Sequence, residues 1–371
     1  MENKHMMAFE FIRGLVAILI AIAVAFIFIF ICADDPGKAL ECLLVKPIIS
    51  NGALNTKSIL TILGRTTPII FTGLAVCVMF SANQFNLGAE GVTMLGGFVG
   101  SLIGIYVPMA AGVHSFVAIL TAAVAGGLVM LIPALVKVKL KASEMVTSLM
   151  LNYVILYIVL HFLNNVFADR SKGATQTFPF ELTSKVGTVV QGTELTYGFF
   201  IALIAAVIVA IFMYRTRWGY AIRMIGINES FSKYSGIKVG SIIIVSQIIG
   251  GFLAGAGGAI EVLGRDITFR WLDLPGYGWT GVTVAILAKN NPIMVPFAAL
   301  FIAYLNRGCE LMAIYAGVPA EMIDIIQAKT RLCKNMFFAA EQFLSRYRQK
   351  LVVKDAKDEI IRKAEMKGEN A

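Results

Sequence analysis

A stripe of polar side chains spaced four residues apart is the first feature of this sequence that could do chemistry. It consists of Glu144, Ser148 and Asn152, and residues four apart lie on one face of a helix. The segment is otherwise apolar, so the stripe faces protein or a water-filled cavity rather than lipid. Such side chains either line a path for a polar solute or hydrogen-bond a neighbouring segment, and both interpretations stand.

A second polar cluster, which includes Asn86 and Glu90, stands at the start of a glycine-rich apolar segment. Near the centre of a bilayer a carboxylate costs about 2.5–3.5 kcal/mol on insertion scales, so Glu90 must lie in protein, in water or near an interface. Either these side chains line a permeation path, or Asn86 caps a helix N-terminus and Glu90 complements its dipole. The two roles are compatible.

Motifs for covalent or metal chemistry are missing from the sequence. It has no nucleophile elbow, no HExxH zinc motif and no GxxxxGK[ST] phosphate loop. The five cysteines form no CxxC pair, and the three histidines are scattered, so no metal-ligand cluster is visible. We therefore expect no enzyme active site, no metal and no cofactor in this chain, and any ATP hydrolysis must come from a partner.

The composition sets the class of protein that positions these side chains. Of the 371 residues, 58% are hydrophobic and 15% are charged, and the mean hydropathy is +0.77. A typical soluble domain is roughly 45–50% apolar and about 25% charged. The sequence therefore predicts an all-α polytopic membrane protein. The net charge of +9 is explained by basic residues on the cytoplasmic side and not by nucleic-acid binding.

About ten transmembrane or membrane-embedded helices are expected. The apolar segments lie near 14–33, 58–80, 88–107, 113–136, 145–163, 196–214, 241–263, 278–288, 292–312 and 319–344. Alternating from a cytoplasmic N-terminus gathers most basic residues inside the cell, so both termini are predicted to be cytoplasmic. The transmembrane domain is expected over 1–345 and a charged cytoplasmic tail over 346–371. An extracellular loop is expected over 164–195, with a small hairpin near 185–192.

One internal repeat stands out. The run Gly88-Ala-Glu-Gly-Val-Thr93 recurs as Gly278-Trp-Thr-Gly-Val-Thr283 and opens a short, glycine-interrupted apolar segment each time. By alternation the two copies enter the membrane from opposite sides. This pattern is typical of inverted pseudo-repeats in transporters, although a chance match in a glycine-rich sequence is the alternative.

Small residues at helical spacing predict close helix packing. Gly96, Gly100 and Gly104 are four apart on one helix, and Gly251 and Gly255 repeat the spacing later. In lipid, small residues let helix backbones approach closely. We expect these glycines to build the bundle and not to bind a ligand.

The basic loop 215–238 is longer than a connector needs. Gly219, Gly226 and Gly236 punctuate it, and a short amphipathic run lies between them. A loop that served only as a positively charged anchor needs neither feature. The sequence therefore favours a docking surface for a cytosolic partner.

Several motifs in order carry a resemblance to a known family. They are FNLGAEG at 85–91, SEMVTSLMLNY at 143–153, the 219–237 loop, GYGWTGVTVAIL at 276–287 and NNP at 290–292. Together they resemble the membrane permease subunits of ATP-binding-cassette (ABC) importers for nucleosides and simple sugars. Importers of this kind work with basic-membrane-protein-type binding lipoproteins.

This resemblance implies a permease subunit in the cytoplasmic membrane, with three protein partners. These are a cytosolic ABC ATPase, a second homologous permease subunit and an extracellular substrate-binding lipoprotein. The cargo is expected to be a nucleoside or, as the alternative, a simple sugar. The ATPase would dock on the loop, at Gly219, Arg223, Gly226, Asn228, Glu229 and Gly236.

The solute path is predicted from polar and aromatic side chains. They are Asn86, Glu90, Glu144, Ser148, Asn152, Tyr277 and Trp279. The two aromatic rings either stack on a base or sugar, or lie in an interfacial aromatic belt.

The sequence departs from the family pattern at three places. Val92 stands where the family often has glutamine, and Ser143 where it often has asparagine. The run Lys329–Asn335 places three cations inside the last apolar segment, which leaves open whether that segment crosses the membrane.

Two other functions are weighed against a permease. An ion-coupled secondary carrier would bind its ion with Glu90, Glu144 or Asp324, but it gives the basic loop no purpose. A membrane enzyme is the second alternative, and the sequence offers no catalytic site for it.

Overall fold

The computed structural model describes residues 35–50, 53–173 and 175–316. The described chain divides into two compact units, and each is treated separately below. The larger is Pro47–Arg307, and the smaller contains the described residues 35–46 and 308–316. The expected apolar segments 14–33 and 319–344 and the tail 346–371 lie outside the described residues.

The larger unit is helical almost throughout. Its helices are α3 (Thr56–Ser81), α4 (Ala89–Tyr106), α5 (Val113–Leu140), α6 (Glu144–Asn165), α7 (Gly198–Arg215), α8 (Arg217–Ile227), α9 (Glu229–Tyr234), α10 (Val239–Arg265) and α11 (Tyr277–Leu287), and α12 (Val295–Ala316) begins in it. Each apolar segment expected between 58 and 312 is thus a helix. Seven of the described helices are long and apolar enough to cross a membrane, and α11 is a shorter apolar helix. The prediction of an all-α membrane bundle is confirmed.

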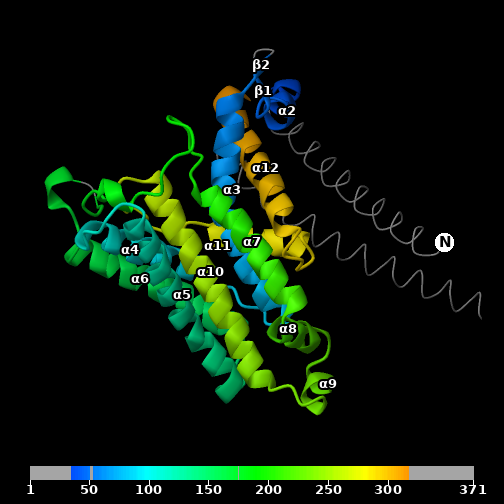
Figure 1. The fold of residues 1–371 in the computed structure, drawn as a ribbon. Coiled ribbons are helices and arrows are strands. Elements are labelled where there is room, and N and C mark those ends of the chain that lie inside the picture. Colours follow the sequence, from blue (N-terminus) through cyan, green and yellow to red (C-terminus); the bar gives the residue numbers. More distant parts are fainter. Residues whose placement is uncertain (1–34, 51–52, 174, 317–371) are drawn as a thin grey trace, which may run out of the picture. The chain divides into compact units, whose positions relative to one another are not determined.

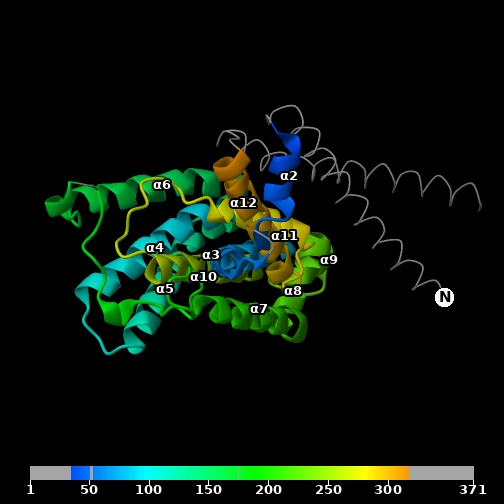
Figure 2. The same ribbon diagram turned by 90° about the horizontal axis from the view of Figure 1, so that it is seen from above.

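Helix α10 forms the centre of this unit and packs against α3, α4 and α5. Viewed from above, α6 and α7 lie on opposite sides of this central group (Figure 2). The central contacts are made by glycines: a Cβ added to Gly255 would overlap the Ala122 carbonyl, and one added to Gly258 would overlap the Thr93 carbonyl. The prediction that small residues build the bundle is confirmed, because these backbones touch where side chains would keep them apart.

The smaller unit contains a helix that the sequence analysis did not predict. Helix α2 (Pro36–Leu44) begins after Asp35, whose side chain accepts a hydrogen bond from the Lys38 N–H at 3.2 Å. Its apolar face packs against the last turns of α12 through Cys42, Cys309 and Met312. An aspartate cap followed by proline is a helix-start signal, which the polar composition of 34–57 concealed.

The connection between α6 and α7 holds little regular structure. It contains two short 3₁₀ helices, Arg170–Lys172 and Leu182–Ser184. The hairpin expected near 185–192 is reduced to one antiparallel bridge between Thr188 and Thr196. The described chain has one two-stranded sheet, between β1 (Ile49–Ser50) and β2 (Ala53–Leu54).

Candidate functional site

The two copies of the internal repeat meet inside the larger unit. The first copy runs into the start of α4 and the second into the start of α11. A Cβ added to Gly278 would overlap the backbone of Glu90, so glycine permits this contact. The sequence repeat therefore corresponds to a junction between two helix N-termini. The expected opposite entry of the two copies into a membrane stays a prediction.

Glu90 holds the start of α11 by its carboxylate. One oxygen accepts a hydrogen bond from the Gly276 N–H, and the other accepts from Gly278 at 2.6 Å and Trp279 at 3.1 Å. The side chain is fully buried. Although Glu90 belongs to the first turn of α4, its carboxylate binds N–H groups at the N-terminus of α11. A dipole interaction with α4 alone is therefore an incomplete account of this residue.

Asn86 does not cap α4, contrary to one interpretation of the sequence. The N-cap residue is Gly88, which makes no side-chain cap bond. Asn86 instead donates from Nδ2 to Oε1 of Gln247 on α10 at 2.5 Å, and its Oδ1 accepts from the Gly88 N–H at 2.7 Å. The buried amide thus ties the segment before α4 to the central helix.

The polar stripe of α6 binds the backbone of that segment and of the first turn of α4. Asn152 accepts from the Gly91 N–H at 2.9 Å and donates to the Leu87 carbonyl at 3.0 Å. Ser148 accepts from the Leu87 N–H at 3.0 Å, and both side chains are buried. The stripe supplies the partners that a non-helical backbone needs inside an apolar bundle.

Glu144, the first residue of α6, completes the stripe. Its Oε1 accepts from the Phe85 N–H at 3.2 Å, and its Oε2 pairs with Lys137 Nζ at 2.8 Å. The interhelical hydrogen bonds expected as one alternative for the stripe are therefore present. Its role in lining a solute path stays a prediction.

The two aromatic residues of the predicted path differ in their surroundings. The Tyr277 hydroxyl donates to Glu261 at 2.8 Å, and its ring lies 6.1 Å from that of Trp271. Trp279 is 37% exposed, while its backbone N–H donates to Glu90. Of the two rings, Trp279 is thus the more accessible.

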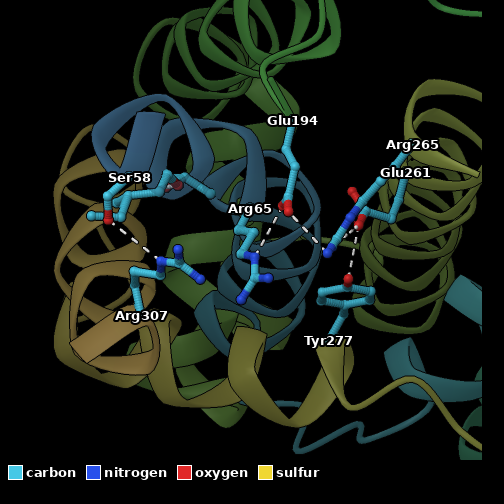
Figure 3. Close-up of polar contacts among 9 residues, drawn as sticks. Ser58, Arg65, Glu194, Glu261, Arg265, Tyr277 and Arg307 are labelled. Atoms are coloured by element: carbon cyan, nitrogen blue, oxygen red, sulfur yellow. Dashed lines mark hydrogen bonds and ion pairs between the residues drawn. The ribbon is translucent and has the colours of Figure 1, made fainter. Parts of the chain in front are cut away.

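A chain of charged groups near the C-terminal end of α10 was not predicted. Glu194 accepts from Arg65 of α3 at 3.1 Å and pairs with Arg265 of α10 at 3.3 Å. Arg265 also donates to Glu261 at 3.1 Å, and Glu261 accepts from the Tyr277 hydroxyl (Figure 3). The chain links the loop before α7 to α3, α10 and α11.

Charged residues inside apolar segments were the signal that would have pointed to this chain. Arg65 and Glu261 lie within the apolar segments 58–80 and 241–263, where ionisable residues are costly and require partners. Arg307 of α12 makes a separate polar contact with α3 and donates to the Ser58 hydroxyl at 3.4 Å (Figure 3). Their pairing could not be deduced from spacing, because the partners are far apart in sequence.

Replacing Arg265 with glutamine is expected to lower the stability of the bundle. It removes a cation from the buried Glu261 and from Glu194, and the loss of hydrogen bonds to charged groups costs about 2–3 kcal/mol. Glu261 keeps the Tyr277 hydroxyl and Glu194 keeps Arg65.

Arg270→Gln is the matched control, because Arg270 also pairs with a carboxylate four residues away, Asp266, but is 69% exposed. Its loss is expected to cost less than about 1 kcal/mol.

Thermal unfolding of the purified variants in detergent measures the difference. Equal unfolding temperatures for the Arg265 and Arg270 variants would contradict a stabilising role for the charged chain. Burial raises the pKa of the Asp266 carboxyl, and the guanidiniums of Arg270 and Arg265 offset part of the rise. In the Arg270 variant Asp266 therefore keeps the influence of Arg265, which limits the cost of that substitution.

The predicted docking loop 215–238 folds as α8 and α9. Gly219 lies against the Phe212 and Met213 carbonyls, and Gly226 lies against the Ser81 carbonyl at the end of α3. A larger side chain has no room at either glycine. The two glycines therefore fix α8 on the ends of α7 and α3.

The remaining residues of this loop shape α9. Asn228 caps it by accepting from the Phe231 N–H at 2.9 Å, and Glu229 is exposed in its first turn. Gly236 ends it with a φ of +82°, a conformation that favours glycine. Arg223 of α8 lies 5.1 Å from the Tyr214 ring. The loop is thus a built element and not a loose connector.

Comparison with known proteins identifies relatives over most of the chain. Residues 58–330 match the model of a family described as branched-chain amino acid transport system / permease component. The glucose ABC transporter permease protein TsgB13 of Haloferax volcanii is 30% identical over 84% of this chain and 85% of its own length. The guanosine ABC transporter permease protein NupP of Bacillus subtilis is 32% identical over 71% of this chain and 77% of its own. The nucleoside ABC transporter permease protein NupB of Lactococcus lactis is 29% identical over 75% and 77%.

The family match covers well over half of the chain and includes both copies of the repeat, the α6 stripe and the loop 215–238. Permeases of this kind are transport subunits that work with an ATPase and another permease subunit. Neither a membrane enzyme nor an ion-coupled carrier is supported. This chain belongs to the family of branched-chain amino acid transport system permease components, and it is a multi-pass membrane subunit of an ABC transporter.

Proposed function

We propose that the chain is a permease subunit that imports nucleosides, with simple sugars as the second candidate, across the cytoplasmic membrane. The relatives named for guanosine, nucleoside and glucose transport support this cargo. Both termini lie in the cytoplasm in this proposal, and an extracellular binding lipoprotein delivers the solute.

The loop 215–238 is proposed as the site where the partner ATPase docks. The observation that carries this proposal is the set of apolar side chains on a loop that is otherwise firmly fixed. Ile227 is 80% exposed, Phe231 is 55% exposed and Tyr234 is 92% exposed. Exposed aromatic residues on a rigid element are the kind of anchor that dominates protein interfaces.

The proposed mechanism is alternating access. ATP-driven movement of the ATPase acts on α8 and α9. The close backbone contacts at Gly219 and Gly226 transmit that movement to α7 and α3. The junction between α4 and α11 is held by bonds from backbone N–H groups to the Glu90 side chain, which can change without unwinding a helix. The solute passes beside this junction, next to Trp279.

The docking proposal predicts that apolar-to-alanine changes at the end of α8 and on α9 uncouple transport. In the triple variant Ile227→Ala, Phe231→Ala and Tyr234→Ala, association with the ATPase is expected to fall about tenfold or more, because each exposed anchor contributes about 1–2 kcal/mol to an interface. Folding should be unaffected, since all three side chains are exposed. Co-purification of the ATPase and solute-stimulated ATP hydrolysis measure the effect.

Phe116→Ala is the matched control for this variant. Phe116 is a similarly exposed aromatic residue, but it lies at the end of the unit where α5 begins, away from α8 and α9 (Figure 1). If the triple variant retains the ATPase as well as the control does, the docking site lies elsewhere. Uptake of labelled guanosine compared with labelled glucose by the assembled complex tests the cargo.

A further inference from the structure

The junction of α4 and α11 brings two positively polarised helix ends to one place. Each helix N-terminus carries the equivalent of about half a positive charge, and anions are stabilised there. The backbone contact between Gly278 and Glu90 shows that the two ends touch. In transporters with interrupted helices, such ends point at an anionic group of the substrate.

At this junction the chain's own carboxylate takes the position of such a group. Both Glu90 oxygens are engaged, by the N–H groups of Gly276, Gly278 and Trp279. Three accepted N–H bonds favour the ionised form of a carboxyl group. Gly276, with a φ of +81°, turns the backbone so that this set of donors converges.

At the N-terminus of α4, the backbone N–H groups donate to neutral side chains. The Gly91 N–H is bound by the Asn152 amide, and the Leu87 N–H by the Ser148 hydroxyl. The N–H groups of Leu87 and Gly91 are therefore bound by neutral side chains, and those at the start of α11 by one carboxylate. A solute carboxylate or phosphate would find these donors taken and a negative charge beside them.

We propose, building on the proposed function, that Glu90 is a resident anion that determines specificity for uncharged solutes. It occupies the donors that would otherwise bind a solute's negative group. The accessible part of the junction is then the ring of Trp279, whose backbone N–H is bound by the Glu90 carboxylate. An uncharged solute with a ring can stack there, whereas a solute carboxylate or phosphate finds the N–H donors occupied and is repelled by the charge of Glu90.

Chemical rescue by acetate tests the resident anion. Glu90→Ala removes a group that acetate resembles, whereas Glu90→Gln fills the same space with an uncharged amide. Both variants, assembled with the ATPase and the second permease subunit in proteoliposomes, are expected to lose uptake of labelled guanosine or glucose about tenfold or more. Added acetate is expected to recover most of this loss in the alanine variant and none in the glutamine variant.

Thermal unfolding provides a readout that does not depend on transport. Acetate is expected to raise the unfolding temperature of the Glu90→Ala complex above that of the Glu90→Gln complex and to leave the unsubstituted complex unchanged. Identical acetate responses of the two variants in both assays would overturn the proposal. Import of labelled leucine by the unsubstituted complex at the rate of the neutral solute would overturn it as well.

The experiment distinguishes failure of the proposed cargo from failure of the proposed role of Glu90. If the unsubstituted complex imports neither guanosine nor glucose but acetate still raises the unfolding temperature of the alanine variant, the proposed cargo is wrong and the resident anion is supported. If it imports guanosine or glucose and acetate has no selective effect, Glu90 is not a resident anion.

Discussion

Replacing Gly126 with alanine is expected to destabilise the bundle by about 3 kcal/mol or more, because a rigid, well-packed contact cannot absorb an added methyl group. Gly126 of α5 faces Gly251 of α10, and a Cβ added to it would overlap the Gly251 carbonyl and approach the Val92 side chain to 2.8 Å. Both obstacles lie on helices that form the centre of the larger unit. Relief therefore requires the helices to separate.

Gly127→Ala is the control, with the same substitution one residue further along α5. Its added Cβ would lie 3.3 Å from the Ile248 carbonyl, a distance that a small shift accommodates. We expect a lower unfolding temperature and aggregation on size-exclusion chromatography for the Gly126 variant only. Similar behaviour of the two variants would show that the contact between α5 and α10 is looser than described.

Replacing Asn152 with leucine is expected to cost about 4 kcal/mol. Leucine has a similar size but leaves the Gly91 N–H and the Leu87 carbonyl without their side-chain partner. Each buried backbone group that loses its partner costs about 1–3 kcal/mol. Because Leu87 lies just before α4 and Gly91 lies in its first turn, we expect this substitution to abolish transport as well.

Tyr153→Leu is the control for position and helix propensity. Tyr153 follows Asn152 on α6 and is exposed. Thermal unfolding and uptake of the two variants are compared in the assembled complex. An Asn152 variant that unfolds and transports like the Tyr153 variant would refute the bridging role of the amide.

Helix positions were predictable because they depend on local composition. A run of apolar residues such as 241–263 is long enough to cross a membrane whatever surrounds it, and α10 (Val239–Arg265) follows it closely. The spacing of Glu144, Ser148 and Asn152 also predicted their common face correctly. What they bind is a backbone more than 50 residues away, which spacing cannot reveal.

The functional junction was predictable only in part. The repeat identified the starts of α4 and α11, but it carried no signal that Glu90 of one copy would bind the N–H groups of the other. Local rules assigned Asn86 to a cap and Glu90 to its own helix dipole. Contacts made by tertiary packing overrode both, since each side chain found its partner on a different helix.

The shortness of α11 has a consequence for the biogenesis of the protein. Its 11 residues span about 16 Å, roughly half the thickness of a bilayer's hydrocarbon core. A nascent segment of that length cannot insert as an independent span, and the amides at its start need the carboxylate of a helix made much earlier in translation. Stable insertion of α11 therefore requires α3 and α4, which are synthesised earlier, to be in the membrane first.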